Sequence, residues 1–516
     1  MNKNMQTVFQ YHEETKHHQH RYARSLGYMD WATQPNPFRE YQEAYKVKLP
    51  LALQHPTPPY STLGTNDVPA APFCLESISQ LMQFSMGIAA YKTTGADSWA
   101  VRCNASSGNL HPTESYLILP SLLEEKTTIT HYNPKNHELE ILTEFESEIW
   151  QTLPEGSFFV ALSSIAWREV WKYGERAFRY VQLDVGHAWQ SIQVSALMLG
   201  WQVTKVDNIS DAQIEHLLGL DQSKRFFETE NGDMLLLVSP HTVGYEIDFS
   251  LLEENLSLNY QGVANQLSPT MHEWEIIPQI IQATATPPYP QQKVEKYIPK
   301  RTPTKESKEV VLGRRSVHVM DKERSYLTQE QFFTILKSVA GSLSGEVCTI
   351  ELVLMVHRVK ELDAGLYILV RNNQHKEALQ KAMYDDFLWQ ETPMDNLYLL
   401  EKRDLTLTSK TISCSQDIAS DGAFTLGMLT PFSQEIQKYT THRYKELYRE
   451  CGAIGQQLYL EATSLGLSGT GIGCFLDDMF HQLLGLKNNN FQSLYHFTVG
   501  VGYVDSRIMT KPAYQE

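Results

Sequence analysis

A repeat at a fixed spacing divides this sequence into two copies of one pattern. The pattern consists of a Lys-Tyr pair, a Gly, a Gln, a Leu-Gly pair and a Leu-Leu-Gly-Leu run. In the first half these elements lie at residues 172–173, 186, 190, 199–200 and 217–220, and in the second half at 438–439, 452, 456, 465–466 and 483–486. Each element of the second copy follows its counterpart by 266 positions, without a gap. Regularity over this length predicts two copies of one domain.

A second pair of segments aligns at a different spacing, so the second copy carries a longer insertion. Residues 105–114 match residues 342–351. Strands are predicted to follow at 115–119 and 352–357, and amphipathic helices are predicted at 186–199 and 452–465. Each helical pattern has a glycine beyond its end. Long helices mixed with a few strands predict an α+β or α/β domain in each half.

The clearest break in composition lies between the two copies, at residues 277–311. It holds prolines at positions 287, 288, 290, 299 and 303 among Lys, Thr and Gln. Because proline is excluded from helix interiors and central strands, this segment is predicted to be an extended linker. The chain would then consist of an N-terminal domain with an N-terminal extension (1–276), the linker, and a C-terminal domain (312–516).

Composition and charge exclude several classes of function. The 516 residues are 42% hydrophobic and 20% charged, which excludes a disordered chain. A net charge of −16 makes general binding to nucleic acid or an anionic membrane unfavourable. No apolar run approaches the ~20 residues of a membrane span, and the first residues lack the order of a signal peptide. We therefore expect a cytoplasmic protein that binds neither nucleic acid nor membrane.

Cysteine and histidine positions do not predict a metal site. The six cysteines lie at 74, 103, 348, 414, 451 and 474. None forms a Cys-x-x-Cys pair, so no zinc knuckle or thioredoxin-type site is indicated and free thiols are expected. His17, His18 and His20 could form a metal-binding tract, but a solvated polar N-terminal segment is the favoured interpretation.

The second copy carries polar groups that the first copy lacks. Arg314, Arg315 and Ser316 precede its first predicted element, and paired guanidiniums match phosphate oxygens. The alternative is that they are the basic end of the linker. A glycine run follows later, Gly469-Thr470-Gly471-Ile472-Gly473. It would let the backbone approach a flat ligand, with a plain turn as the alternative. Arg507 adds a cation beyond the last predicted strand.

The first copy carries the complementary polar groups. At the position of the glycine run it has residues 203–209, which include no glycine, and no Arg-Arg-Ser precedes its first helix. It has instead a Ser-Ser-Gly-Asn segment at 106–109. These side chains could merely cap a turn. One complete set of polar groups nevertheless exists per chain, divided between the halves.

At these residues the chain resembles the nitroreductase-like flavoproteins, which are usually homodimers with FMN at the subunit interface. The family's R-R/H-S-x-R/K motif matches residues 314–318, where His318 replaces the usual Arg or Lys. Its P-S-x-x-N-x-x-P segment matches residues 105–112, with Ala105 in place of the first proline. The glycine run and Arg507 match the flavin-covering loop and the phosphate-binding C-terminal region.

Within that group the chain more closely resembles the SagB/ThcOx-type dehydrogenases. The resemblance rests on residues 11–16, on Arg102 with residues 106–112, and on residues 172–180. In peptide-modifying members a Lys-Tyr pair is implicated in oxidising thiazolines or oxazolines to azoles. The resemblance therefore implies a catalytic role for Lys172 and Tyr173. Recurrence of the pair at 438–439 favours a structural role instead.

The resemblance implies an FMN-dependent oxidoreductase of α+β fold, with two nitroreductase-like domains in tandem as an intramolecular pseudo-dimer. One FMN per chain is expected between the domains. Its expected ligands are Arg102, Ser106, Ser107, Asn109, Gly469, Thr470, Gly471, Ile472, Gly473, Arg314, Arg315, Ser316, His318 and Arg507.

The implied substrate is a small molecule or an azoline-type modified peptide, with NAD(P)H or O2 as the redox partner. The full chain would be a monomer or a homodimer. Two alternatives remain open. One is an NAD(P)H-dependent nitroreductase or quinone reductase, and the other is a non-catalytic flavin-binding scaffold subunit of a peptide-modifying complex.

Overall fold

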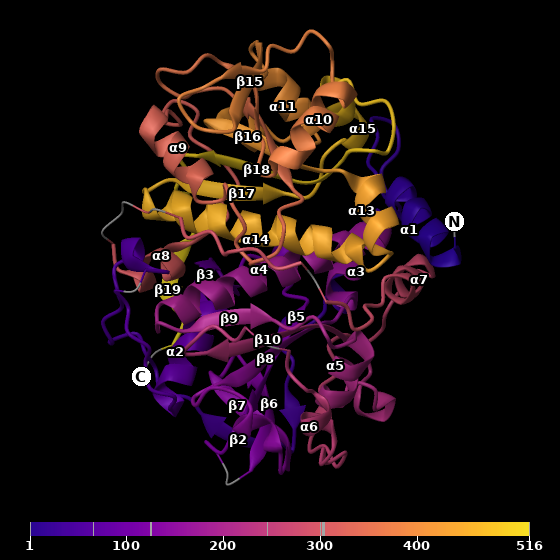
Figure 1. Cartoon of the computed structure of the whole chain (residues 1–516), viewed down its shortest axis with the longest axis vertical. Coiled ribbons are helices and arrows are strands. Elements are labelled where there is room, and N and C mark those ends of the chain that lie inside the picture. Colours follow the sequence, from indigo (N-terminus) through magenta and orange to yellow (C-terminus); the bar gives the residue numbers. More distant parts are fainter. Residues whose placement is uncertain are drawn as a thin grey trace.

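Two antiparallel sheets lie on either side of a central pair of helices (Figure 1). The computed structural model describes residues 2–65, 67–123, 126–244, 246–290, 292–299, 301 and 305–514. None of the described helices has the length and apolar composition needed to cross a membrane.

Each half of the chain builds one seven-stranded sheet, and both sheets have the same order of strands. The first sheet has the order β2 (Tyr45–Lys48), β7 (Glu138–Phe145), β6 (Thr127–Asn133), β5 (Thr113–Leu119), β8 (Phe158–Ser164), β10 (Asn231–Ser239) and β9 (Gln202–Lys205). The second has the order β14 (Gln390–Glu391), β15 (Leu397–Lys402), β13 (Gly365–Leu369), β12 (Glu351–Val356), β16 (Phe424–Thr430), β18 (Gln492–Gly500) and β17 (Ser468–Ile472).

Equivalent central strands also pair in the same register. Glu114 of β5 pairs with Ser163 of β8, and Glu351 of β12 pairs with Leu429 of β16. Glu114 and Glu351 are equivalent in the second sequence alignment, whereas Ser163 and Leu429 are separated by the fixed spacing of 266. The two spacings read from the sequence therefore agree with the strand pairing.

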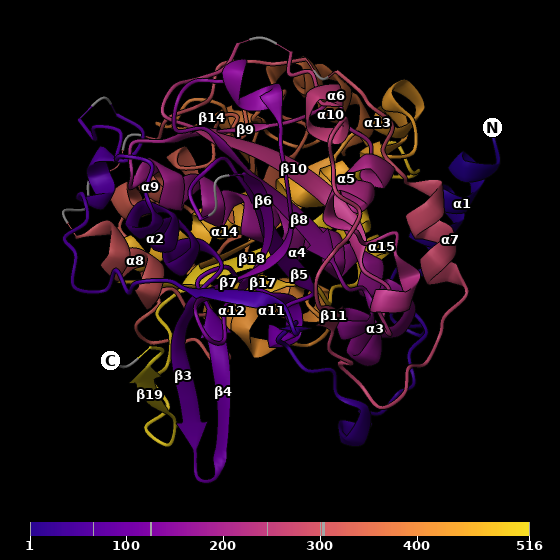
Figure 2. The same cartoon turned by 90° about the horizontal axis from the view of Figure 1, so that it is seen from below.

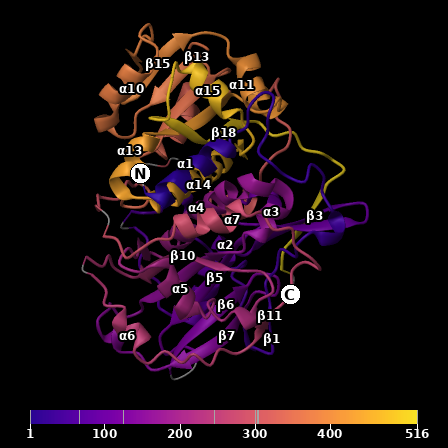
Figure 3. The same cartoon turned by 90° about the vertical axis from the view of Figure 1, so that its right-hand side faces the viewer.

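Two long helices fill the layer between the sheets (Figures 1 and 3). They are α4 (Ala177–Leu197) and α14 (Arg443–Ser464), and they pack against each other along their length. The sequence pattern predicted that these helices begin at Gly186 and Gly452. Each helix in fact begins nine residues earlier, so both glycines lie in helix interiors.

The two interior glycines mark the closest approach of the helices. A Cβ atom on Gly186 would collide with the carbonyl oxygen of Arg449, and one on Gly452 would collide with that of Leu183. Leu183 and Arg449 are themselves 266 positions apart. The contact is therefore reciprocal, as in an interface between two copies related by a two-fold axis.

One apolar core passes through this interface. It includes Phe178 and Leu183 from α4 and Tyr444 and Ile454 from α14, all at most 2% exposed. Burying a side chain of this size contributes about 1.5–3 kcal/mol. The two halves therefore share a core rather than touching through polar surfaces.

The remaining elements surround this frame. In the first half they are α1 (Lys3–Glu14), α2 (Leu75–Ser85), α3 (Trp167–Tyr173), α5 (Asp211–Leu218), α6 (Ser250–Glu253), α7 (Ile276–Ala283) and the ribbon of β1 (Tyr41–Gln42) with β11 (Val263–Ala264). In the second half they are α8 (Ser307–Gly313), α9 (Gln329–Lys337), α10 (Lys376–Ala382), α11 (Thr406–Ile412), α12 (Asp417–Asp421), α13 (Phe432–Tyr439) and α15 (Asp477–Leu483).

Each end segment packs on the opposite half. Helix α1 lies beside α14 (Figure 3), where the His12 ring contacts the Tyr444 hydroxyl at 3.3 Å and the Gln492 amide oxygen at 3.0 Å. Strand β19 (Met509–Pro512) pairs with β3 (Ile88–Thr94), which also pairs with β4 (Asp97–Arg102) (Figure 2).

This docking corrects the expectation of a solvated N-terminal segment. Val8 and Tyr11 are fully buried, and His17 is 8% exposed. The backbone N–H of His17 donates to the Asp477 carboxylate at 2.9 Å. The segment is ordered because the apolar face of α1 packs on both halves, with Tyr11 against Phe178 of α4 and Tyr444 of α14.

The predicted linker is only partly extended. Helix α7 occupies its start and α8 crosses its end, so the boundaries at 277 and 311 fall inside helices. Ile277 and Ile280 are buried, and a helix forms here because Pro278 lies in its first turn, where proline is tolerated, and the next proline comes only at Pro287. Pro303 lies outside the described residues.

Candidate functional site

The two arginines of the predicted phosphate clamp lie where α8 ends, at the boundary between the halves. Arg314 is 4% exposed. Its Nε donates to the carbonyl of Cys103 and its Nη2 to that of Arg102, both at 2.8 Å. Arg315 donates to carbonyls of its own turn. Arg314 thus joins the second half to the backbone that leads into residues 106–109.

These guanidiniums and Lys92 of β3 form a cationic group without an acidic neighbour. Burial and the like charge of Arg314 lower the pKa of Arg315 to about 10. Burial and then Arg315 lower the pKa of Lys92. Among the described residues, no carboxylate contributes to the pKa of any of the three. A phosphate bound here would neutralise charge that the protein leaves uncompensated.

The glycine run forms the edge strand β17 rather than the predicted loop. It pairs with β18 along residues 468–472. A Cβ atom on Gly469 would lie 2.7 Å from the Phe497 ring, and one on Gly471 would collide with Tyr495. The glycines are therefore needed for packing against aromatic rings of the neighbouring strand. The side chain of Ile472 is 2% exposed in a small apolar cluster, away from the interface.

Hydrogen bonds join the clamp to this strand. The hydroxyls of Ser316 and Tyr459 lie 2.7 Å apart, and the N–H of Gly471 donates to the same Tyr459 oxygen at 2.8 Å. The N–H of Val317 donates to the Thr470 hydroxyl at 3.0 Å. The clamp and the strand edge therefore form one connected unit.

The Ser-Ser-Gly-Asn segment is held against α4. The N–H and hydroxyl of Ser107 donate to the Asp184 carboxylate at 3.0 and 2.8 Å. The Ser106 hydroxyl accepts from the N–H of His111 at 2.8 Å, and the Asn109 amide donates to a carbonyl of β4 at 2.9 Å. Burial raises the pKa of Asp184 to about 7, although hydrogen bonds from both serines lower it. This carboxyl can therefore exchange a proton near neutral pH.

The Lys-Tyr pair ends α3 and faces the same segment. A Cβ atom on Gly108 would lie 2.7 Å from the Tyr173 hydroxyl and 3.1 Å from Lys172 Nζ. The rings of Tyr173 and Tyr180 are 4.4 Å apart, and Tyr180 lies against Gly473. The pair, the Ser-Gly segment and the end of β17 therefore meet at one place. Burial raises the pKa of Tyr173 well above its ordinary value, so its phenol stays protonated.

Two further residues of this region were missed by the sequence analysis, Glu169 and Lys92. Glu169 precedes Lys172 by three residues on α3 and is fully buried, and neither carboxylate oxygen has a hydrogen-bond partner among the described residues. Burial and then Asp184 raise its pKa well above the ordinary value, with Lys172 opposing them. A lone Glu or Lys within an ordinary helix or strand pattern carries no signal that could have identified either residue.

Three predicted ligands are placed elsewhere. The guanidinium of Arg102 is buried, donates to the Pro37 carbonyl at 2.6 Å, and offers only its backbone to the clamp. His318 is exposed. The Arg507 side chain is 83% exposed and pairs with Asp505 at 2.7 Å, because both lie in an exposed turn before β19. We call the region formed by residues 314–316, 469–473, 106–109 and 172–173 the clamp site.

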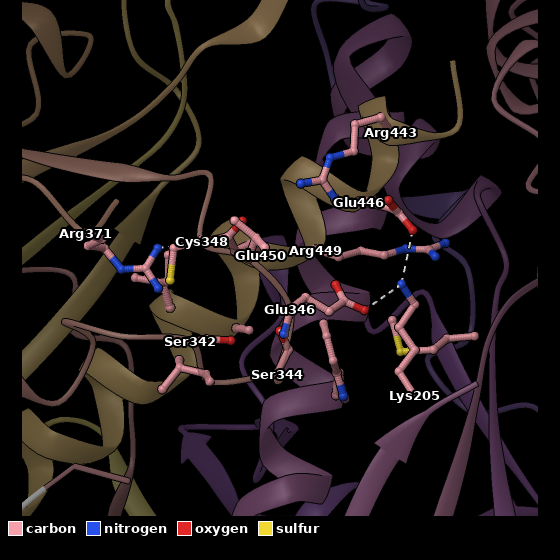
Figure 4. A pocket seen from close by; sticks show the side chains of 16 residues that line it. Lys205, Ser342, Ser344, Glu346, Cys348, Arg371, Arg443, Glu446, Arg449 and Glu450 are labelled. Carbon is pink, nitrogen blue, oxygen red and sulfur yellow. Dashed lines mark hydrogen bonds and ion pairs between the residues drawn. The ribbon is translucent and has the colours of Figure 1, made fainter. Parts of the chain in front are cut away.

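A cavity lies between the two halves and is lined by residues of both (Figure 4). It encloses about 470 Å³ of empty space, including its mouth. Lys205 Nζ lies 3.1 Å from Glu346 and 3.0 Å from Glu446, and Arg443 lies 3.1 Å from Glu446. We call this region, with Arg449, the ion-pair cavity.

Mutual attraction sets the direction of the pKa shifts of Lys205 and Glu446, whereas burial raises the pKa of Glu346. Burial alone would favour the neutral amine, but Glu346 and Glu446 raise the pKa of Lys205 above its ordinary value. Burial would likewise raise the pKa of Glu446, but Lys205 and Arg443 hold it well below its usual range. The charges are therefore paired with one another and leave none for a ligand.

The ion-pair cavity and the clamp site correspond through the sequence repeat. Glu450 and Asp184 are equivalent, and each accepts from a backbone N–H, although the donors, Thr349 and Ser107, are not equivalent in the alignment. At the sheet edges, Lys205 of β9 pairs with β10 at the position at which Gly471 of β17 pairs with β18. The equivalent pairs are Lys205 and Gly471, Glu446 and Tyr180, and Glu450 and Asp184.

Comparison with known proteins relates this architecture to nitroreductases. Residues 363–503 match the model of the Nitroreductase family. A candidate nitroreductase of Methanocaldococcus jannaschii is 26% identical over 163 residues, which cover 30% of this chain and 78% of that protein. The crystal structure of a candidate nitroreductase from Anabaena variabilis covers 96% of this chain and 99% of its own, with a TM-score of 0.70 and 21% identity. The second half therefore carries a nitroreductase-family domain, and the whole chain has the fold of the Anabaena protein.

Proposed function

We propose that this chain is an FMN-dependent oxidoreductase of the SagB/ThcOx type that binds one FMN at the clamp site. One observation carries the proposal. Arg314 and Arg315 of the second half lie at the same interface position as the Ser-Ser-Gly-Asn segment with Lys172 and Tyr173 of the first half, whereas the equivalent position is lined by ion pairs.

The residues of the clamp site fit a flavin phosphate. Arg314, Arg315 and Lys92 would hold its oxygens, since arginine's planar fork matches them and no described carboxylate competes. Ser107 and the edge of β17 would contribute hydrogen bonds from the two sides of the interface. The exposed Arg507 would reach the site only if the turn before β19 moved.

Bound FMN supplies a two-electron acceptor for hydride, while the protein orients the substrate and handles the proton. Tyr173 and Glu169 are held protonated by burial, and Asp184 exchanges its proton near pH 7. Lys172 lies beside Tyr173 and Glu169 and can stabilise negative charge that develops on the substrate. Tyr173 can donate to, or accept from, the substrate atom that faces Gly108.

The chain would then be a tandem duplication in which one of two equivalent sites has been lost. In a homodimer each interface site takes its clamp from one subunit and its Ser-Asn segment from the other. The matched sheets and the reciprocal glycine contact support this origin, and the replacement of Gly471 by Lys205 explains why only one site remains. The substrate would be a small molecule or an azoline-type peptide.

Flavin stoichiometry tests the proposal. The purified chain is reconstituted with FMN, and the flavin released by heat is quantified per chain from its visible spectrum. About one FMN per chain supports the proposal. Two per chain would contradict the loss of the second site, and a protein that cannot be reconstituted would exclude a flavoenzyme.

Rapid-mixing reduction then identifies the reaction. Bleaching of the flavin by an azoline-containing peptide supports the dehydrogenase. Fast bleaching by NADH or NADPH, with turnover of quinones or nitroaromatics, would indicate the reductase instead. A bound flavin that no physiological donor reduces would indicate the scaffold subunit.

A further inference from the structure

Two half-buried cysteines from distant parts of the second half meet just beyond the end of β17. The Sγ atoms of Cys414 and Cys474 lie 2.7 Å apart, although the residues are 60 positions apart in the chain. The Leu476 N–H donates to the Ile412 carbonyl at 2.7 Å, and the Gln416 amide donates to the Cys474 carbonyl at 3.2 Å. These bonds hold the two backbones together on both sides of the thiols, so their contact belongs to the fold.

The pair is surrounded by groups that favour a thiolate on one member. The titratable and charged neighbours are His17 and Tyr22 from the N-terminal segment, Arg176 before α4, and Tyr180 within α4. His17 Nδ1 accepts from the N–H of Ala23 at 3.0 Å. The neutral ring therefore carries its proton on Nε2, from which it can donate to the Cys474 sulfur.

These neighbours divide the pair into a nucleophile and a protonated partner. The contact with Cys414, then His17 and Arg176, outweighs burial and lowers the pKa of Cys474 to about 5. The same contact, with burial, raises the pKa of Cys414. At Cys348, by contrast, burial raises the pKa. The thiolate is the reactive form of cysteine, so the Cys474 sulfur reacts first.

We propose that Cys414 and Cys474 form a redox-active dithiol in which the Cys474 sulfur reduces a small hydroperoxide and Cys414 closes the disulfide. Partial burial of both thiols favours a small oxidant over a protein disulfide. The dithiol lies directly after Gly473, at the rim of the clamp site, but its chemistry is independent of flavin binding.

The reaction consists of two balanced steps. The Cys474 thiolate attacks one peroxide oxygen and the O–O bond breaks, which gives a sulfenic acid on Cys474 and an alkoxide that takes up a proton and leaves as the alcohol. The Cys414 sulfur then attacks the Cys474 sulfur, and the S–S bond forms. Hydroxide leaves and combines with the Cys414 proton as water. Two electrons pass from the thiols to the peroxide.

Alkylation of the unmodified chain provides the first test, because it requires no variant to fold. The reduced protein is treated with iodoacetamide at pH 6, and each cysteine is followed by peptide mass spectrometry. We expect Cys474 to react at least ~10-fold faster than Cys348, a half-buried thiol in the ion-pair cavity. Equal rates would overturn the assignment of Cys474 as the nucleophile.

Hydrogen peroxide provides the second test, on flavin-free and reconstituted chain alike. We expect titratable thiols to fall from six to four and a Cys414–Cys474 linked peptide to appear. Cys414→Ser should trap a dimedone adduct on residue 474, Cys474→Ser should give no adduct on Cys414, and Cys348→Ser should still form the link. Absence of the link in the unmodified chain, or an equal adduct on Cys414 in Cys474→Ser, would overturn the proposal. Since FMN is not needed, failure here is distinct from failure of the proposed function.

Discussion

The clamp site and the ion-pair cavity occupy equivalent positions in the two copies, but their charged side chains are arranged differently. In the clamp site, cations lie beside Gly471 without acidic partners, and an acidic group, Asp184, binds backbone and hydroxyl instead. In the ion-pair cavity, Lys205 replaces that glycine and is paired with Glu346 and Glu446. The cations of the clamp site therefore lack a described acidic partner, whereas Lys205 in the ion-pair cavity is paired with carboxylates.

This difference supports the proposal that the repeated fold retains one binding site and has lost the other. The frame around both positions is the same, including strand order and the reciprocal contact of the central helices. The second position still holds a cavity, and a buried lysine between carboxylates lines it. Such a pair is stable only while each charge keeps its partner.

Removing Lys205 should have the largest effect on stability. Lys205→Met leaves Glu346 and Glu446 buried without their shared partner and is expected to cost about 3–5 kcal/mol. Without the amine, burial raises the folded-state pKa of these carboxyls, so the loss should grow as pH rises from 5 to 8. Urea unfolding at several pH values measures it. Lys381→Met, which breaks an exposed pair with Glu377, should cost at most about 0.5 kcal/mol, and a similar loss in both variants would contradict the contrast.

The reciprocal glycine contact predicts the next largest effect. Gly452→Val places a branched side chain against the Leu183 carbonyl and should cost about 3 kcal/mol of unfolding free energy, since two packed helices must separate. Gly186→Val should cost a similar amount, because its environment is the reciprocal one. Thermal unfolding of both, with Gly244→Ala at an open position as the control, measures this. A large inequality between the two glycines would show that the halves are not equivalent at their contact.

The cationic group predicts a smaller effect that is specific to ligand binding. Arg315→Ala should weaken FMN binding by roughly 10- to 100-fold, the value of about 1.5–3 kcal/mol expected for a charged hydrogen bond. Folding should change little, because Arg315 bonds only to carbonyls of its own turn. Fluorescence titration of the flavin measures the affinity, with the half-exposed Arg403→Ala as the control. Unchanged affinity in Arg315→Ala would contradict the assignment of the FMN phosphate to this position.

The titration of Asp184 predicts the smallest effect. Its pKa, about 7 in the folded chain, lies above the ordinary value, so the folded state holds the proton more tightly than the unfolded state. Unfolding free energy should therefore fall by about 1–2 kcal/mol as pH rises from 6 to 7.5. Asp184→Asn should flatten this slope in urea unfolding of the flavin-free chain, and the exposed Asp385→Asn should not. An unchanged slope in Asp184→Asn would mean that another group titrates.

The sequence predicted the repeated architecture because the repeat is a one-dimensional signal. Spacing alone related Gly186 to Gly452, and it foresaw that complementary polar groups come from different halves. The sequence analysis wrongly placed both glycines at helix starts and the run 468–472 in a loop. In each case the glycine is needed because of packing against residues that are distant in the sequence. Gly186 and Gly452 are required by the carbonyls of Arg449 and Leu183 on the facing helix. The glycines of β17 are required by the aromatic rings of β18.

The site residues that the sequence could not predict are those whose role depends on tertiary contacts alone. Lys92 becomes part of the clamp site through the pairing of β3 and β4, and Glu169 through its burial beside Asp184. Conversely, Arg507 matched a motif, yet its nearest partner, Asp505, is only two residues away in an exposed turn.

Because each end segment packs on the opposite half, some contacts of the first half can form only after the second half has been synthesised. His12 of α1 binds Tyr444 and Gln492, and β3 receives β19. At about 5–20 residues per second, a ribosome makes Gln492 about 25–95 s after His12. Until then α1 lacks its contacts with the second half, and one edge of β3 lacks its partner strand. The nascent first half therefore has to be kept from aggregation by other means, and its clamp site can be completed only once translation has passed the second half.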